Sequence, residues 1–307
     1  MIRKCLVAGA GFFVLITLAS AEIFRVAAFN VENYLDQPTE SRRSIKSDEA
    51  KAKVRETILA MKPDVIAFEE MGTLSALLEL RDSLKRNGLE FPHYEHVSGW
   101  DTNIHVAVLS RFPIVTRRPH TNDTYLLNGR RYHVSRGFSE VDIQVNPDYQ
   151  FTLIGAHLKS RRAVPEADEA EMRLEEAKLL REIVDKKLAN NPNANLIVLG
   201  DFNDTYDTKA IKEIIGRRRT KLLDTRPAEP NGDNQPHPTN PHYSPRNVTW
   251  THYYGVEDSY SRIDYILLSP GMAREWVPSQ TYIPTIANWG TGSDHRPVLA
   301  TFEAQNK

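Results

Sequence analysis

The segment LIVLGDFN, Leu196–Asn203, indicates the fold most directly. Four apolar residues suit a short buried strand, and a glycine with two polar side chains follows at once. Ligands of open α/β sheets bind where strands end, so Asp201 and Asn203 are candidate site residues. The alternative is a turn that only caps the strand, because Asp and Asn side chains also bond their own backbone.

Short apolar or alternating runs of the same kind recur along the chain, and each lies beside polar residues. We expect strands at Phe24–Phe29, Asp64–Phe68, His105–Leu109, Phe151–Ala156, Ile263–Leu268 and Pro297–Phe302. Two longer, adjacent strands are predicted at His133–Val145 and Gln150–His157. The polar residues at or beside strand ends are Asn30, Glu69, Glu70, His157, Asp264, Asp294 and His295. They are distant in sequence, but a sheet can bring them together at one edge.

Helical patterns lie between the strands, at Lys51–Met61, Leu74–Lys85 and Pro165–Leu188. The last is the clearest, since its apolar residues recur at steps of three and four and acidic residues occupy its first turns. Helices and strands together predict a mixed α/β fold. No linker divides residues 22–307, so we expect a single catalytic domain. The polar stretch Asp224–Val248 is predicted to be a long loop that shapes a substrate entrance.

The first 21 residues have the features of a secretory signal peptide. Arg3 and Lys4 precede an apolar run of 14 residues, and small residues end at Ala21, the expected cleavage point. The alternative, an uncleaved anchor, is disfavoured because a spanning helix needs ~20 apolar residues. The sequence therefore predicts an exported protein, periplasmic or secreted, without a stable membrane anchor. Cys5, the only cysteine, lies in this segment, so the mature chain has no disulfide.

The net charge argues against a protein that binds polyanions over its whole surface. Without Arg3 and Lys4 the chain has 37 basic and 40 acidic residues, a net charge of −3. Arg136 and Lys159 remain candidates for binding phosphate, although a solvated positive face is the commoner explanation for such residues. Trp250, Tyr253 and Tyr254 form a cluster that we expect to belong to the core.

The candidate site residues point to metal chemistry. Carboxylates and amides are hard oxygen ligands that suit Mg²⁺ or Mn²⁺. Two histidines, His157 and His295, can move protons near neutral pH. The alternatives remain an Asp264 solvated on an edge strand and a His157 satisfied in the core. On residue types alone, the pattern favours a metal-assisted hydrolase.

Six segments in fixed order give a more specific indication. They are Phe29–Asn33, Lys62–Glu70, Gly155–Leu158, Gly200–Asn203, Arg262–Ile266 and Gly292–Val298. Together they resemble the endonuclease/exonuclease/phosphatase superfamily, which includes pancreatic-type deoxyribonucleases, abasic-site endonucleases, neutral sphingomyelinases and inositol-polyphosphate 5-phosphatases. The resemblance runs from about Phe24 to Phe302. It implies an α/β (α+β) fold, a four-layer sandwich of two mixed β-sheets flanked by helices.

The resemblance also implies a role for each matching residue. Glu70 would bind the catalytic metal, with Asn30 beside it and Asp294 completing the metal or phosphate shell. Asp201 would orient or deprotonate the attacking water, and Asn203 would hydrogen-bond the phosphate. His295 would contact the scissile phosphate, and Asp264 would hold the His295 ring in place. His157 matches a second histidine of the deoxyribonuclease and sphingomyelinase branches. Between Glu69 and Glu70, the family pattern favours the second.

These observations lead to a prediction of function. We expect an exported hydrolase of phosphodiester bonds, dependent on Mg²⁺ or Mn²⁺, with nucleic acid as substrate and a monomeric state. The alternative is a phosphomonoesterase or a sphingomyelinase/phospholipase C-like enzyme acting on small or lipid phosphates. A binding module on a degenerate fold is disfavoured, because no expected catalytic position is replaced.

Overall fold

The computed structural model describes residues 22–230 and 247–305. The expected signal peptide, residues 1–21, lies outside these ranges, as does most of the long loop expected at Asp224–Val248. Within the described ranges, no helix is long and apolar enough to cross a membrane.

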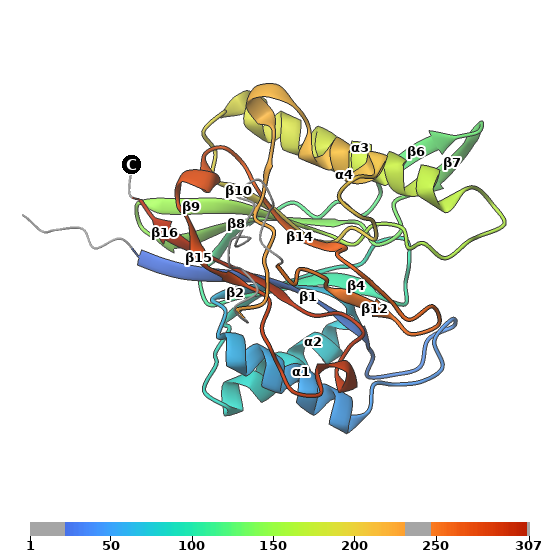
Figure 1. Cartoon of the computed structure of the whole chain (residues 1–307), viewed down its shortest axis with the longest axis horizontal. Helices are drawn as coiled ribbons and strands as arrows, with labels where there is room; N and C mark the ends of the chain where they lie inside the picture. The colour runs from blue at the N-terminus through green and yellow to red at the C-terminus, as the bar shows by residue number, and fades with distance from the viewer. Residues whose placement is uncertain (1–21, 231–246, 306–307) are drawn as a thin grey trace, which may run out of the picture.

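Two six-stranded mixed sheets form the centre of the molecule (Figure 1). The first has the order β15 (Trp276–Tyr282), β16 (Val298–Ala304), β1 (Glu22–Tyr34), β2 (Val65–Met71), β4 (His105–Ser110) and β3 (His93–Val97). The second has the order β11 (Leu223–Asp224), β14 (Asp264–Leu268), β10 (Leu196–Asp201), β9 (Tyr149–Ala156), β8 (Phe138–Asn146) and β5 (Ile114–Arg117). Two hairpins are separate: β6 (Thr124–Leu127) with β7 (Arg130–His133), and β12 (His252–Tyr254) with β13 (Ser259–Ser261).

Helices cover the outer face of each sheet (Figure 1). The first sheet carries α1 (Asp48–Met61) and α2 (Leu74–Arg86), and the second carries α3 (Glu169–Asn190) and α4 (Lys209–Ile215). Short 3₁₀ turns lie at Arg218–Thr220, Met272–Arg274 and Trp289–Thr291. The four layers confirm the predicted sandwich of two mixed sheets flanked by helices.

Apolar burial between the two sheets holds the layers together. Phe24 of β1 lies 5.2 Å from the ring of Phe151 on β9 and 5.4 Å from that of Phe302 on β16. All three side chains are buried. Full burial of such a side chain contributes about 1.5–3 kcal/mol, so this interface fixes the sheets face to face.

Two predicted elements differ from the structure. Of the single strand expected at His133–Val145, only the part from Phe138 onward is one strand, β8. His133 ends β7, and Gly137 turns the chain between the two strands with φ of +69°. A Cβ on Gly137 would lie 2.4 Å from the His120 carbonyl oxygen. The helix expected from Pro165 begins only at Glu169, where the Asp168 side chain accepts the Glu171 N–H at 2.9 Å.

Strand pairing brings the candidate residues to one edge of the sandwich. In the first sheet, β1 and β2 run parallel and pair Asn30 with Glu69. In the second, β10 and β14 run antiparallel and pair Asp201 with Asp264. Since the two sheets face each other, these polar strand ends converge between the layers.

Candidate active site

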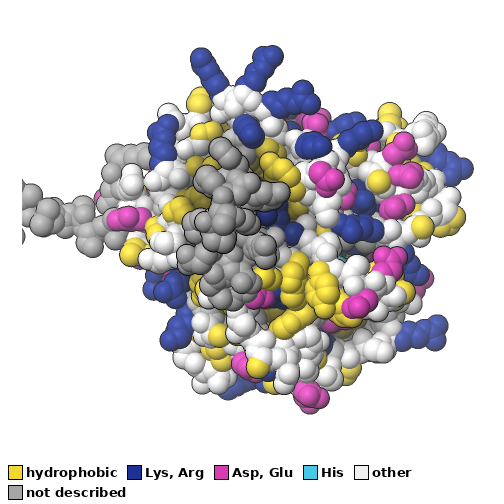
Figure 2. Space-filling model, in the orientation of Figure 1, with side chains coloured by type: hydrophobic (Ala, Val, Ile, Leu, Met, Phe, Trp, Pro, Cys, Tyr) yellow, Lys and Arg dark blue, Asp and Glu magenta, His cyan; other side chains and the backbone are white. Residues whose placement is uncertain are grey.

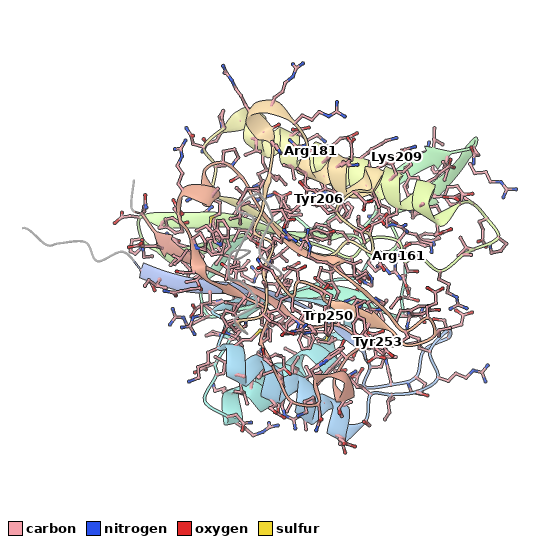
Figure 3. The ribbon with its side chains drawn as sticks, in the orientation of Figure 1. Arg161, Arg181, Tyr206, Lys209, Trp250 and Tyr253 are labelled. Atoms are coloured by element: carbon pink, nitrogen blue, oxygen red, sulfur yellow. The ribbon has the colours of Figure 1, made fainter. Side chains whose placement is uncertain are left out.

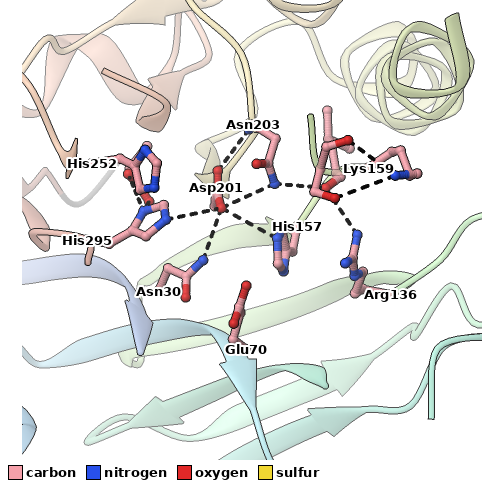
Figure 4. A network of polar contacts seen from close by, with 12 residues as sticks. Asn30, Glu70, Arg136, His157, Lys159, Asp201, Asn203, His252 and His295 are labelled. Carbon is pink, nitrogen blue, oxygen red and sulfur yellow. Dashed lines mark hydrogen bonds and ion pairs between the residues drawn. The ribbon is translucent and has the colours of Figure 1, made fainter. Parts of the chain in front are cut away.

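Asp201 lies at the centre of the polar cluster (Figure 4). Its side chain is almost fully buried, and its Oδ2 accepts a hydrogen bond from Asn30 Nδ2 at 3.0 Å. The Nε2 atoms of two histidines lie near the same oxygen, His157 at 3.4 Å and His295 at 3.8 Å. Burial raises the pKa of Asp201 to about 6. Asp201 is therefore a carboxylate with imidazoles on two sides.

The pairing of β9 with β10 places His157 beside the Asp201 carboxylate. Strand β9 pairs in parallel with β10, with Gly155 opposite Leu199, so the residue after β9 reaches Asp201. The ring is fully buried, and burial lowers its pKa well below the ordinary value. His157 is thus a neutral imidazole beside Asp201, and its Nδ1 has no hydrogen-bond partner among the described residues.

Asp264 and His295 form the predicted pair. Nδ1 of His295 lies 2.9 Å from Asp264 Oδ2 and 3.2 Å from Oδ1. Burial lowers the pKa of the His295 imidazole, but the Asp264 and Asp201 carboxylates outweigh it and raise that pKa well above its ordinary value. His295 is therefore a buried imidazolium whose Nε2 faces the site.

Hydrogen bonds to the backbone hold this pair in place. The Ser293 hydroxyl donates to the Asn30 carbonyl at 2.7 Å and accepts the His295 N–H at 3.0 Å. The Thr251 hydroxyl accepts the Asp264 N–H at 3.2 Å. The Ser293 bonds join the chain before β16 to β1, and the Thr251 bond joins the chain before β12 to the start of β14.

Several site residues occupy the left-handed region that side chains other than glycine seldom adopt. Glu32, Asn33, Glu70 and Asn203 have φ between +43° and +59°. Such conformations cost about 1–3 kcal/mol each and persist where surrounding contacts impose them. At Asn203 the imposing contact is visible, because Asp201 Oδ1 accepts the Asn203 N–H at 2.8 Å.

The predicted phosphate-binding residues lie near the cluster but already have partners. Asn203 Nδ2 donates to the Leu158 carbonyl at 3.0 Å. Arg136 is buried, with Nη1 3.4 Å from the same carbonyl and Nε 3.6 Å from Asp101. Lys159 is also buried, and its Nζ donates to the Arg162 carbonyl at 3.1 Å. The Arg136 guanidinium carries more N–H donors than these bonds use, which leaves room for a phosphate contact. The phosphate-binding roles of all three residues stay predictions.

Two of the predicted metal ligands, Glu70 and Asp294, lie with Glu32 in a second group of carboxylates. Glu70 is half-buried, points from the end of β2 toward the cluster, and accepts the Asn33 N–H at 3.0 Å (Figure 4). Burial raises the pKa of Glu32, and the charges of Asp294 and Glu70 raise it further. The sequence analysis missed Glu32 and also Lys46, whose Nζ donates to the Glu32 carbonyl at 2.9 Å. Three carboxylates thus surround one ammonium group.

This group fits a divalent cation on chemical grounds. Glu32, Glu70 and Asp294 carry more negative charge than Lys46 neutralises, and all are hard oxygen donors. The Asn33 Oδ1 atom is buried without a hydrogen-bond partner among the described residues. The donor set therefore matches Mg²⁺ or Mn²⁺, and Asn30 is adjacent to it, because its Oδ1 accepts the Glu32 N–H at 2.9 Å.

Glu69, which the sequence left as the lesser candidate, is fully buried and faces β10 of the second sheet. Both carboxyl oxygens lack a hydrogen-bond partner within the described ranges. Burial raises its pKa well above the ordinary value, and the charges of Asp264 and Asp201 add to this. A Cβ on Gly200 would lie 2.7 Å from its Oε1, so the glycine makes room for the carboxyl group.

His252 is a further residue that the sequence analysis missed. It opens the β12–β13 hairpin and pairs across an isolated bridge with His295. Its Nε2 lies 3.7 Å from Asp294 Oδ2, and the two imidazole centroids are 4.6 Å apart. The hairpin strands have three residues each, too short to show a periodic pattern.

The neighbouring aromatic residues do not belong to the core, contrary to expectation. Tyr254 is exposed, and Trp250 and Tyr253 are only half-buried. Tyr260 of the hairpin lies 4.8 Å from both Trp250 and Tyr253, and Trp250 also packs on Trp289 at 5.4 Å. Figure 2 shows hydrophobic side chains gathered on this face, and Figure 3 labels Trp250 and Tyr253 in the same orientation.

Comparison with known proteins gives one sequence family and many similar folds. The Endonuclease/Exonuclease/phosphatase family profile matches residues 27–295. Among curated proteins, no sequence matches the chain.

Three solved structures illustrate the similarity of fold. Beta toxin 275-280 from Staphylococcus aureus has a TM-score of 0.63 at 18% identity, covering 90% of this chain and 99% of its own. Sphingomyelinase C from Streptomyces griseocarneus has a TM-score of 0.61 at 17% identity, covering 92% and 99%. The human Nocturnin catalytic domain, with bound sulfate, has a TM-score of 0.61 at 16% identity, covering 93% and 98%.

Proposed function

The chain belongs to the endonuclease/exonuclease/phosphatase family of metal-dependent phosphoesterases, and we propose that it is an exported phosphodiesterase that acts on nucleic acid. The observation that carries the proposal is the position of Asp201. This buried carboxylate lies within 3.8 Å of two imidazoles and accepts a hydrogen bond from Asn30. Such a group can orient water and accept its proton.

The proposed reaction is an in-line attack of water on phosphorus. The water oxygen forms a bond to phosphorus, the bond to the leaving oxygen breaks, and Asp201 accepts a proton from the water. The His295 imidazolium, held by Asp264, faces the charge that develops on the phosphate and can return a proton to the leaving oxygen. A divalent ion, when bound by Glu70 with Asn30 and Asp294, supplies charge neutralisation at the phosphate.

Exposed groups around the site support nucleic acid as the substrate. Arg161 is exposed at the rim, where its Nε donates to the Asn203 carbonyl at 3.0 Å. Figure 3 places Arg161, Trp250 and Tyr253 on the same face. Trp100 is 67% exposed and stacks on His133 with 3.9 Å between centroids. Arginines bind backbone phosphates and exposed aromatic rings stack on bases.

A substrate panel tests the proposal. The purified mature protein is expected to hydrolyse plasmid DNA or RNA with Mg²⁺ or Mn²⁺ faster than it hydrolyses sphingomyelin or phosphate monoesters. Asp201→Asn is the matched inactive control, because it keeps the shape of the side chain and removes the proton acceptor. Rapid hydrolysis of monoesters alone would contradict the phosphodiesterase assignment.

One observation favours a second candidate, a sphingomyelinase or phospholipase C-like activity. Val256, at the tip of the β12–β13 hairpin, is 82% exposed, and Tyr254 beside it is also exposed. Exposed apolar side chains next to a phosphate site suit a lipid headgroup presented at a membrane surface. Preference for sphingomyelin over DNA and RNA in the panel would favour this candidate.

A further inference from the structure

A second set of metal-binding atoms lies beside the oxygen cluster and differs from it in chemistry. His252, Asp294 and His295 each offer one ligand atom, and these atoms all lie within 4.8 Å of one another. Two of the three are imidazole nitrogens. Imidazole suits Zn²⁺ and its neighbours in the transition series, whereas carboxylates and carbonyls suit Mg²⁺.

The backbone holds the two imidazoles as cross-strand neighbours. The Tyr253 N–H donates to the Asp294 carbonyl at 3.0 Å, and the Arg296 N–H donates to the Thr251 carbonyl at 2.6 Å. This short antiparallel ladder places His252 opposite His295. Residues opposite each other on an antiparallel pair have their side chains on one face, about 4.5–5.5 Å apart at Cβ. The proximity of the rings is therefore built into the backbone.

The distances suit a small tetrahedral ion. The Asp294 carboxylate oxygens lie 3.7 Å from His252 Nε2 and 3.9 Å from His295 Nε2. Zn²⁺ bonds of about 2.0–2.1 Å need ligand atoms roughly 3.3 Å apart. The two Asp294–histidine pairs must therefore close by about half an ångström, and the three ligand atoms all lie within 4.8 Å of one another before any ion binds. The Asp294 side chain is 44% exposed, so an ion can enter and water can take the fourth position.

The contact with Asp264 orients His295, the most buried of the three ligands. His295 binds Asp264 through Nδ1 at 2.9 Å, which leaves Nε2 directed toward Asp294. A carboxylate on the distal nitrogen is the usual partner of a metal-binding histidine. The same Nε2 is the atom that faces the phosphate in the proposed reaction.

We propose that His252, Asp294 and His295 bind one transition-metal ion such as Zn²⁺. Its bond to His295 Nε2 displaces the proton of that imidazolium to solvent and occupies the atom needed at the phosphate, so the bound ion inhibits hydrolysis. The site shares Asp294 with the carboxylates around Glu70, which take the activating ion, and differs from them in its two imidazole ligands.

Direct Zn²⁺ binding tests the site without any need for turnover. Untagged mature protein at pH 8 with millimolar Mg²⁺ is titrated with Zn²⁺ against a chromophoric chelator. One Zn²⁺ per chain is expected. Asp264→Asn, which removes the supporting carboxylate, is expected to weaken Zn²⁺ binding about 10–100-fold, and His252→Ala at least as much. His93→Ala, on the edge strand β3, is the matched control and is expected to bind as the unmodified chain does.

Three outcomes would overturn the proposal: no stoichiometric Zn²⁺ binding, equal binding by His252→Ala, or binding that only Glu70→Gln abolishes. An inhibition arm adds a second readout. In saturating Mg²⁺, His252→Ala is expected to need at least about tenfold more Zn²⁺ than the unmodified chain for half-inhibition of its own rate. Because the binding arm uses no substrate, it stands or falls separately from the proposed nuclease activity.

Discussion

His295→Ala is expected to lower kcat by about 10²–10⁴, the range for a positioned acid–base group. Asp264→Asn is expected to impair the same step, because Asp264 holds the ring through Nδ1 at 2.9 Å and raises the pKa of the imidazole. The double variant is then expected to lose far less than the product of the two single losses. Single-turnover hydrolysis of a phosphodiester measures the three rates.

The matched control for this cycle is His93→Ala, which removes a half-buried imidazole from the edge strand β3. Its rate is expected to stay within about threefold of that of the unmodified chain, which corresponds to a change of about 0.6 kcal/mol in the activation free energy. If the losses of the Asp264 and His295 variants multiply independently, the two residues do not act as a pair. Circular dichroism of each variant separates loss of chemistry from loss of fold.

Glu70→Gln is expected to reduce the rate at least about 100-fold at low Mg²⁺, more than the loss of an outer-shell partner. The amide keeps the size of the side chain but removes the charge that offsets the cation. Added Mg²⁺ is expected to recover part of the rate, and Mn²⁺ binding followed by electron paramagnetic resonance is expected to weaken in parallel. Glu49→Gln, an exposed substitution in α1, provides the control. Unchanged Mn²⁺ affinity in Glu70→Gln would show that the ligands lie elsewhere.

The strands and their polar ends could be predicted because they are local patterns. LIVLGDFN forms β10 and its following turn as expected, and the apolar run at Ile263–Leu268 forms β14. The Asp264–His295 contact could also be predicted, since an unpaired carboxylate in an apolar strand is costly to bury. The structure confirms this contact at 2.9 Å.

Other contacts depend on sheet order or local backbone, which a single sequence does not reveal. The partner of His157 became identifiable only once β9 was placed beside β10. Glu70 adopts φ of +59°, so simple strand alternation does not describe how it and Glu69 are directed. Lys46 reaches the carboxylates from a loop, and His252 lies on a three-residue strand, so neither had a pattern to mark it.

The central claim is that hydrolysis needs a divalent ion held by oxygen ligands. The most direct measurement is the rate of hydrolysis of a simple phosphodiester, first after exhaustive treatment with a chelator and then as Mg²⁺ or Mn²⁺ is restored. The account predicts that the rate falls to the uncatalysed level in chelator and returns with either ion. Full activity in excess chelator would contradict it.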